Sequence, residues 1–175
     1  MYRFKMVTAV ALVAAATAAP WVALGAQQVR ETQVTLLVTG LHCAPCAQVV
    51  QQALNRLKGV RMAEVDWSRK SARVWFDEQT LPLQSLTAAI SNTPHMMGGS
   101  QRYAGWYLIK TPAVAEPAQA ERVKKVLLGV TGVRQVAAYP AQRSVAVLLE
   151  DRGHSLTTSR LRAALEQEGF DVVDD

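Results

Sequence analysis

The chain repeats its own pattern at a shift of 73 positions, and this repeat limits the folds open to it more than any other feature. Without a gap, Leu57 to Val60 falls on Val130 to Val133, and Ser71 to Asp77 falls on Ser144 to Glu150. After two extra residues in the second half, which make the shift 75 positions, Leu86 and Ile90 match Leu161 and Leu165. Similarity at a fixed offset is typical of repeated structural units. The 175 residues therefore contain two versions of one unit, each large enough for one modest core.

Each unit is expected to order its elements as strand, helix, strand, strand, helix. In the first unit, Gln33 to Thr39 is a run rich in Val and Thr that predicts a strand. Apolar residues then recur at helical spacing from Val50 to Leu57, and Gly59 stands where a helix end is expected. Two alternating segments, 63–67 and 72–76, predict a hairpin, and a second helix starts near Pro82.

The two units meet near residue 105. The shift places the first strand of the second unit at 106–111, whereas the first unit needs a fourth strand after Pro94. Residues 102–110 could serve either role, and a single long strand could pair with both halves. Pro112, Pro117 and the alanines between them indicate a loop or tether. We therefore divide the chain into 30–105 and 106–175, with the last strand at Phe170 to Val173.

The chain has two cysteines, Cys43 and Cys46, in the segment Gly-Leu-His-Cys-Ala-Pro-Cys, where the first strand gives way to the first helix. Unpaired N–H groups at a helix start favour thiolates, so both thiols are expected to ionise more easily than free cysteine. Two thiolates at this spacing suit a soft ion that accepts few ligands, Cu(I) or Hg(II). Zn(II) fits less well, because it needs His42, His95, a carboxylate or a second chain to complete its shell.

Two other uses of the same cysteines remain open. A C-x-x-C pair after a strand and at a helix start is also typical of thioredoxin-like oxidoreductases. Pro45 and a cis-proline loop at Thr93-Pro94 would support that alternative, whereas the strand, strand, helix continuation argues against it. A small structural disulfide is the third alternative, although so short a loop restricts the unfolded chain little.

The first half resembles the heavy-metal-associated domain family of copper chaperones, copper-ATPase tails and periplasmic mercury-binding proteins. That family has a G-M-x-C-x-x-C loop and an L-x-G-V helix ending, matched here by Gly40 to Cys46, with Leu41 in place of Met, and by Leu57 to Val60. The resemblance implies an α+β, ferredoxin-like βαββαβ fold in both tandem copies, with Cys43 and Cys46 as metal ligands. The second copy carries Glu116 and Gln119 at these positions and lacks cysteines.

The resemblance also places the loop after the second helix beside the cysteine loop. His95, Met96 and Met97 lie in that loop and, with His42, are candidate auxiliary metal ligands. Methionine suits Cu(I) and stays a ligand in oxidising surroundings. The alternative is that at least one of the two methionines packs beneath the cysteine loop.

Residues 1–26 have the form of an export signal. Arg3 and Lys5 precede about twenty uncharged, Ala-rich residues, and Leu24-Gly25-Ala26 then leads into polar sequence. The alternative is an uncut membrane anchor. In both cases we expect a periplasmic or otherwise extracytoplasmic protein, either free or anchored to the inner membrane.

No catalytic constellation is found. There is no P-loop and no Ser/His/Asp set, and no aromatic residues alternate with the basic ones as in nucleic-acid binding proteins. We expect a carrier of one soft ion, not an enzyme, that passes the ion to a metal-transporting or metal-accepting protein. The alternative function is a thiol-disulfide oxidoreductase. Basic residues cluster between Arg56 and Arg73 and could steer an acidic partner. The sequence does not choose between monomer and dimer.

Overall fold

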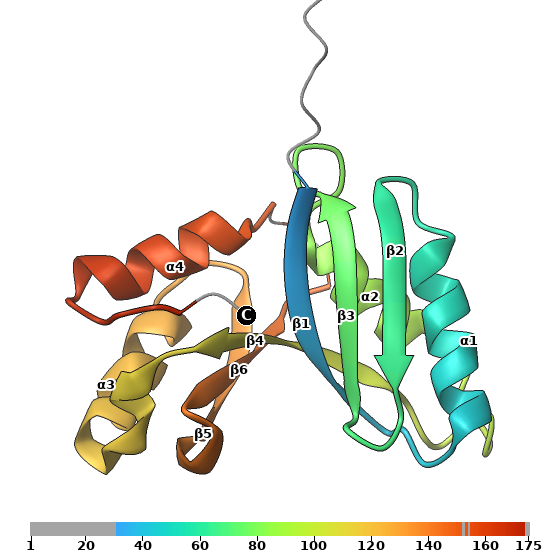
Figure 1. The fold of residues 1–175 in the computed structure, drawn as a ribbon, viewed down its shortest axis with the longest axis horizontal. Coiled ribbons are helices and arrows are strands. Elements are labelled where there is room, and N and C mark those ends of the chain that lie inside the picture. Colours follow the sequence, from blue (N-terminus) through green and yellow to red (C-terminus); the bar gives the residue numbers. More distant parts are fainter. Residues whose placement is uncertain (1–30, 152, 154, 174–175) are drawn as a thin grey trace, which may run out of the picture.

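One continuous six-stranded sheet runs through both halves of the chain in the computed structural model, which describes residues 31–151, 153 and 155–173 (Figure 1). The first half contains β1 (Glu31–Thr39), α1 (Ala44–Asn55), β2 (Val60–Asp66), β3 (Ser71–Asp77), α2 (Leu83–Asn92) and β4 (Ala104–Lys110). The second half contains the 3-10 helix η1 (Pro112–Ala115), α3 (Pro117–Leu128), β5 (Val133–Tyr139), the 3-10 helix η2 (Pro140–Gln142), β6 (Ser144–Leu149) and α4 (Thr158–Gln167).

The predicted fold class, α+β with two ferredoxin-like units, is confirmed. The strand order is β2-β3-β1-β4-β6-β5, and all neighbours are antiparallel. β2-β3-β1-β4 is the complete sheet of the first unit. β4 then also serves as the first strand of the second unit, because its start pairs with β1 and its end pairs with β6. The single strand that pairs with both halves is thus observed.

Sharing β4 shortens the end of the second unit. The predicted closing strand at Phe170 to Val173 is wrong as a strand, since only an isolated bridge joins Val173 to Lys110. The physical reason is competition for one strand edge, because β1 already pairs with residues 104–107 of β4. The predicted tether is also wrong, because Pro112 begins η1 and Pro117 begins α3.

The repeat extends to details of the backbone. β2 shifts register between Val60 and Met62, and β5 does so between the matching Val133 and Gln135. Gly59 and Gly132, which follow α1 and α3, both have positive φ, +103° and +95°, a conformation that favours glycine. The two hairpins also agree, because Lys70 and Arg143 are both left-handed, with φ of 51° and 48°.

The core lies between the sheet and the helices. Val34, Leu36 and Val38 alternate along β1 with more exposed residues and are nearly inaccessible to solvent. In the second half, Val145, Val147 and Leu149 of β6 are buried against α3 and α4. Because the sheet is continuous, the buried apolar residues of both halves form one cluster.

Polar contacts join the two units behind the sheet. The carboxylate of Glu78 accepts hydrogen bonds from the backbone N–H and the hydroxyl of Thr158, the first residue of α4. Gln84 is buried in α2, and its side-chain oxygen accepts a hydrogen bond of 3.0 Å from the N–H of Leu156. A first-unit carboxylate thus satisfies a donor at the start of a second-unit helix.

The predicted export signal or anchor at 1–26 lies outside the described residues. Within the described part of the chain, no helix combines the length and the apolar character needed to cross a membrane.

Candidate metal centre

Cys43 and Cys46 lie where β1 gives way to α1, at one end of the first unit (Figure 1). Cys43 is the N-cap of α1, with an extended backbone, and its side chain makes no capping hydrogen bond. Pro45 lies in the first turn, where its fixed φ suits the helix and its missing N–H costs nothing. The Cys46 side chain is fully buried and that of Cys43 is half-buried. The helix start therefore brings both thiols together, with only one open to solvent.

The two thiols form a close pair. The Sγ atoms are 2.7 Å apart, and both cysteines are free. The hydrogen bond from Cys43 lowers the pKa of Cys46, and donating it raises the pKa of Cys43. The prediction that both thiols ionise more easily is thus right for Cys46 and wrong for Cys43. Two neighbouring sulfurs that share one proton favour a single thiolate over two.

Tyr103 lies beside this pair, and the sequence analysis missed it. The side chain is 1% exposed, and its hydroxyl finds no partner at full hydrogen-bond geometry among the described residues. Burial, followed by the contact with Cys46, raises the pKa of Tyr103 to about 12. The hydroxyl therefore keeps its proton, and Tyr103 helps to lower the pKa of Cys46. The only sequence signal was a tyrosine at the end of a Gly-rich loop.

His95 connects the loop after α2 to the cysteine loop. Its Nε2 is 3.0 Å from the carbonyl oxygen of Gly40, and its Nδ1 accepts a hydrogen bond of 3.1 Å from the N–H of Met97. These contacts assign the ring proton to Nε2. The ring also lies 4.5 Å from that of Tyr103 and 5.8 Å from that of His42, centroid to centroid. Both ring nitrogens are thus in use, and His42 is exposed next to them.

Met96 and Met97 are far from buried. Their exposed fractions are 55% and 69%, so the alternative that one of them packs beneath the cysteine loop is wrong. Leu41, at 2% exposure, lies buried at the start of the cysteine loop, and Tyr103 is buried beside Cys46. Leu41 and Tyr103, and not the two methionines, are therefore the buried side chains near this loop.

A third strong ligand is not assembled at the thiols. Among the described residues, no group of three or more His, Cys, Asp or Glu side chains is arranged to hold a metal ion. A structural zinc site has four protein ligands and a catalytic one has three. The two cysteines by themselves supply fewer ligands than either kind of zinc site.

One feature that would have supported the thioredoxin-like alternative is not observed. No cis peptide bond occurs in the described part of the chain, so Thr93-Pro94 does not form the cis-proline loop of that alternative. The strand, strand, helix continuation after α1 is also observed as predicted.

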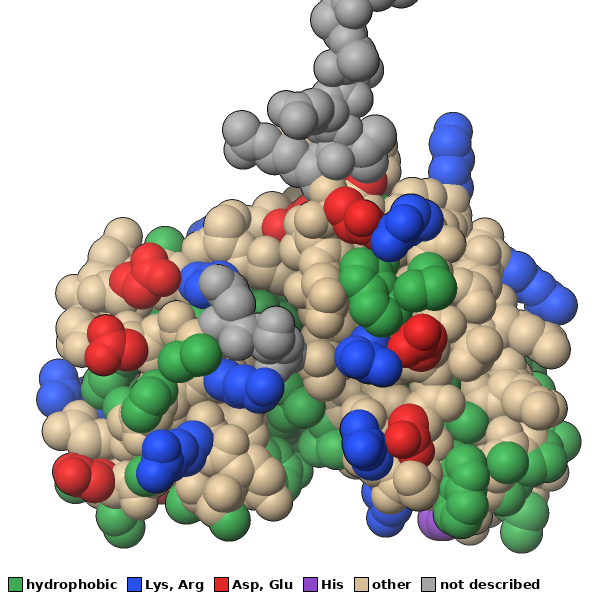
Figure 2. Space-filling model, viewed as in Figure 1, with side chains coloured by type: hydrophobic (Ala, Val, Ile, Leu, Met, Phe, Trp, Pro, Cys, Tyr) green, Lys and Arg blue, Asp and Glu red, His purple; other side chains and the backbone are tan. Residues whose placement is uncertain are grey.

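Three of the six basic residues between Arg56 and Arg73 form ion pairs. On the open face of the sheet, Arg61 pairs with Glu31, Arg69 with Asp66, and Arg73 with Glu64, and blue and red side chains alternate there in Figure 2. Exposed pairs of this kind contribute little to stability. They also reduce the basic character that the sequence assigned to this face.

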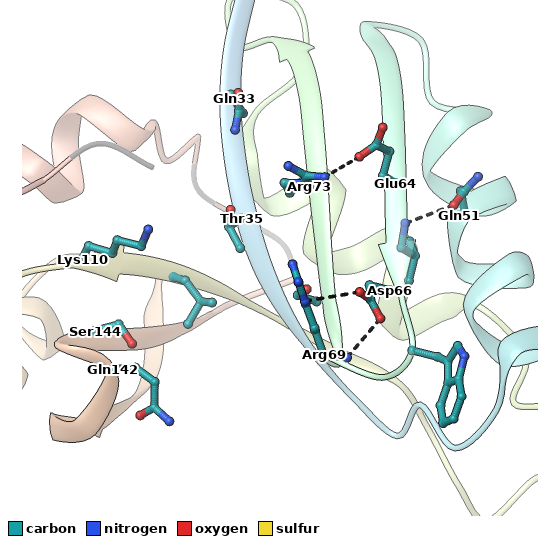
Figure 3. A pocket seen from close by; sticks show the side chains of 14 residues that line it. Gln33, Thr35, Gln51, Glu64, Asp66, Arg69, Arg73, Lys110, Gln142 and Ser144 are labelled. Atoms are coloured by element: carbon teal, nitrogen blue, oxygen red, sulfur yellow. Dashed lines mark hydrogen bonds and ion pairs between the residues drawn. The ribbon is translucent and has the colours of Figure 1, made fainter.

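A large hollow lies on this open sheet face and not at the cysteines. The groove measures about 770 Å³, and its lining includes Gln33 and Thr35 of β1 on one side and Lys110, Gln142 and Ser144 on the other (Figure 3). Arg69 and Arg73 point along it while paired to Asp66 and Glu64. None of the candidate metal ligands lines the groove. The thiol pair therefore lies outside this groove.

Several known proteins match parts of this chain. The heavy-metal-associated domain family matches residues 35–95. The mercuric transport protein periplasmic component of Shigella flexneri is 37% identical over 89 residues, which cover 50% of this chain and 88% of that protein. The mercuric reductase of Serratia marcescens is 30% identical over 132 residues, 67% of this chain and 28% of the reductase. Oxidized MerP from Ralstonia metallidurans CH34 is 27% identical, with a TM-score of 0.38, over 44% of this chain and 96% of that one.

Proposed function

This chain belongs to the heavy-metal-associated domain family, and we propose that its first unit binds one Cu(I) or Hg(II) ion between Cys43 and Cys46 and hands it to a partner protein. The observation that carries the proposal is the pair of free sulfurs 2.7 Å apart at the start of α1. A small outward movement of Cys43 would open the pair around an ion held on a line between the two sulfurs.

The donor set favours soft ions with few ligands. Thiolates select soft ions, and no third His, Cys, Asp or Glu ligand joins the pair within the described residues. Zn(II) would have to take its missing ligands from water or a second chain. Hg(II) is the first ion to test, because several relatives are named mercuric transport proteins.

The unequal burial of the two cysteines suggests an order of transfer. Cys43 is half-buried and at the mouth of the site, whereas Cys46 is fully buried under the loop. An incoming thiolate would join the ion to give a three-coordinate intermediate, and Cys43 would leave first. The Cys46 thiolate, supported by Tyr103, would be the last ligand to let go.

The location and the partner follow from the N-terminal pattern and from the relatives. We propose that residues 1–26 direct the chain out of the cytoplasm, either as a cleaved signal or as an anchor in the inner membrane, and that a metal-transporting protein receives the ion. Relatives named periplasmic components support this location. In this proposal residues 30–105 carry the ion, and residues 106–175 hold that unit in position.

A second function uses the same observation. Two free sulfurs at 2.7 Å are close enough to join as a disulfide in an oxidising compartment, which would make the pair a thiol-disulfide exchanger. That function predicts turnover in a disulfide-reduction assay that is indifferent to metal chelators.

The decisive experiment is an anaerobic titration of the reduced protein with Hg(II), Cu(I) and Zn(II), each in competition with a chelator of known affinity. We expect tight one-to-one binding of Hg(II) or Cu(I) and weak binding of Zn(II). Cys43→Ser with Cys46→Ser should lower the affinity by more than the roughly 10- to 100-fold that loss of an outer-shell partner costs. Full-strength binding by the double variant would rule out the thiol site. Weak binding by the wild type, together with a readily exchanging disulfide, would favour the redox function.

A further inference from the structure

Met96 and Met97 occupy the tip of a tight turn beside the cysteines. The N–H of Gly98 bonds to the carbonyl oxygen of His95 at 3.4 Å, so the two methionines are the central residues of a four-residue turn. Gly98 has a φ of +113° at the turn exit, and the space around it is open. The turn therefore directs two adjacent thioether side chains outward from the metal end of the first unit.

Packing does not account for this arrangement. Burying a methionine stabilises a fold, and neither residue obtains this stabilisation in full, since they remain 55% and 69% exposed. Single exposed apolar residues are common and need no explanation. Here, however, two flexible thioethers are adjacent in one turn, and His95 of the same turn contacts the loop that carries the two free thiols. The ring of Tyr103, which is buried, packs against His95 of the same turn.

His95 holds this turn against the cysteine loop. One ring nitrogen donates to Gly40, which precedes the cysteine loop, and the other accepts from the N–H of Met97 within the turn. The ring also packs against Tyr103. His95 is thus a positioning residue, because binding a metal would require it to give up one of these hydrogen bonds.

From these contacts we propose that Met96 and Met97 form an outer receiving site for Cu(I), which passes the ion inward to Cys43 and Cys46. This inference rests on the proposed thiol site and names the ion that this route serves. Thioethers are soft, neutral donors that suit Cu(I), and they remain ligands in surroundings that oxidise thiols. Hg(II) reaches the thiols without them.

The transfer is a ligand exchange in which copper stays Cu(I). Cu(I) first binds the two thioether sulfurs. The Cys46 thiolate then forms a Cu–S bond as one thioether leaves. Cys43 forms the second Cu–S bond as the other thioether leaves, and its thiol proton passes to water. The ion ends between two thiolates, and both methionines are free for the next ion.

The test measures loading rates in the reduced full chain, with Cu(I) delivered from a coloured chelator complex in a stopped-flow instrument. Met96→Leu with Met97→Leu keeps the size and apolar character of the tip but removes the sulfurs. We expect Cu(I) loading to slow by about tenfold or more, with the final Cu(I) affinity nearly unchanged and Hg(II) loading unaffected. Met62→Leu is the matched control, since Met62 is also exposed, at 38%, but lies on the edge strand β2.

Two further variants separate this inference from the thiol site itself. Cys43→Ser with Cys46→Ser should leave a weak Cu(I) site that disappears when both methionines are also replaced by leucine. His95→Ala should speed hydrogen exchange at the Met97 amide and slow Cu(I) loading more than Hg(II) loading, because His95 also contacts the cysteine loop at Gly40. Wild-type Cu(I) loading by the double leucine variant overturns the receiving site, and the thiol proposal then stands or falls by its own titration.

Discussion

The two units have the same arrangement of the backbone but differ in the side chains that cover their edge strands. In the first unit, Gln51 and Asn55 of α1 accept hydrogen bonds from the N–H groups of Val65 and Ala63 on the edge strand β2, at 3.0 and 2.8 Å. The matching positions in α3 are Lys124 and Leu128. Neither side chain has an acceptor, so the edge of β5 has no such cover. Leu128 is instead 49% exposed.

The two units also differ in the loop before their first helix. Glu116 is the N-cap of α3, as Cys43 is of α1, and Pro117 opens the helix where Pro45 stands near the start of α1. The backbone of the loop has therefore been kept while its thiols have been replaced. Positive-φ positions and a strand bulge are also common to both units. The comparison teaches that backbone requirements specify this fold, whereas the side chains that do chemistry can be exchanged on it.

The largest effect is expected from moving the thiols to the second unit. Glu116→Cys with Gln119→Cys, made in the Cys43→Ser, Cys46→Ser background, places a C-x-x-C pair on the same backbone. No described residue of the second unit supports it as Tyr103 and His95 support the first. We expect soft-metal affinity about 10- to 100-fold below that of the native pair, measured by chelator competition. Equal affinity would show that the backbone alone makes the site.

The contact between the units gives the next largest effect. Glu78→Ala removes the carboxylate that accepts two hydrogen bonds from Thr158 and leaves a donor at the start of α4 without its partner. We expect the free energy of unfolding to fall by about 1.5–3 kcal/mol, as measured by urea denaturation. Gln79→Ala, at the exposed neighbouring position, should change little. An unaltered midpoint for Glu78→Ala would mean that this carboxylate contributes little to holding the units together.

Exchanging the edge cover should act in opposite directions on the two units. Asn55→Leu removes the acceptor for the N–H of Ala63 on β2. We expect the free energy of unfolding to fall by about 0.5–1.5 kcal/mol. Leu128→Asn places an amide beside β5. We expect it to raise the free energy of unfolding by up to the same amount and to lower any tendency of the chain to self-associate. Urea denaturation and sedimentation velocity measure the two quantities. A stabilising Asn55→Leu would contradict the role given to this side chain.

The two hairpins should respond differently to acid. The Ser68 hydroxyl and the backbone N–H of Arg69 bond to Asp66 and hold its pKa below the usual value, whereas the matching residue of the second unit is Tyr139. A lowered carboxyl pKa stabilises the fold above the unfolded pKa of about 3.9, and this contribution is lost as pH falls through the folded pKa. Hydrogen exchange below about pH 4 should therefore rise first in β2 and β3. Asp66→Asn should remove the difference.

The smallest effect is one in which the units should agree. Lys70 and Arg143 are both left-handed at the turn before the third strand of their unit. Left-handed backbone costs a residue with a side chain about 1–2 kcal/mol, and glycine is spared this but loses more entropy on folding. Lys70→Gly and Arg143→Gly should each change stability by less than about 1 kcal/mol, with the same sign. Opposite signs in thermal unfolding would show that the two turns are not equivalent.

The fold was predictable because its signals are local and repeated. The fixed offset, the glycines before the second strand of each unit and the alternating strands are all readable in one dimension, although α1 ends at Asn55 and not at Gly59. The end of the second unit was not, because its closing strand lost a competition with β1 for one edge of β4, and sequence periodicity carries no information about competition between distant segments.

The candidate site was predictable only in part for a similar reason. Cys43 and Cys46 are neighbours in sequence, so their spacing indicated their meeting. Tyr103 and His95 reach them from loops more than forty residues away, and the resemblance to a family gave only the neighbourhood of that loop. The difference between the two thiols, one with a raised pKa and the other with a lowered pKa, depends on which sulfur donates the hydrogen bond. No pattern of residues specifies that.

The shared strand β4 also determines how this molecule can approach another one. In a chain of separate domains, a metal-carrying domain can turn freely while its neighbours trail behind. Here β4 is part of both units, so Cys43 and Cys46 can change direction only when the second unit turns with them. If the first unit hands over an ion as proposed, its receiver must have room for both units. The unit without cysteines would then exclude any receiver whose shape does not leave that room.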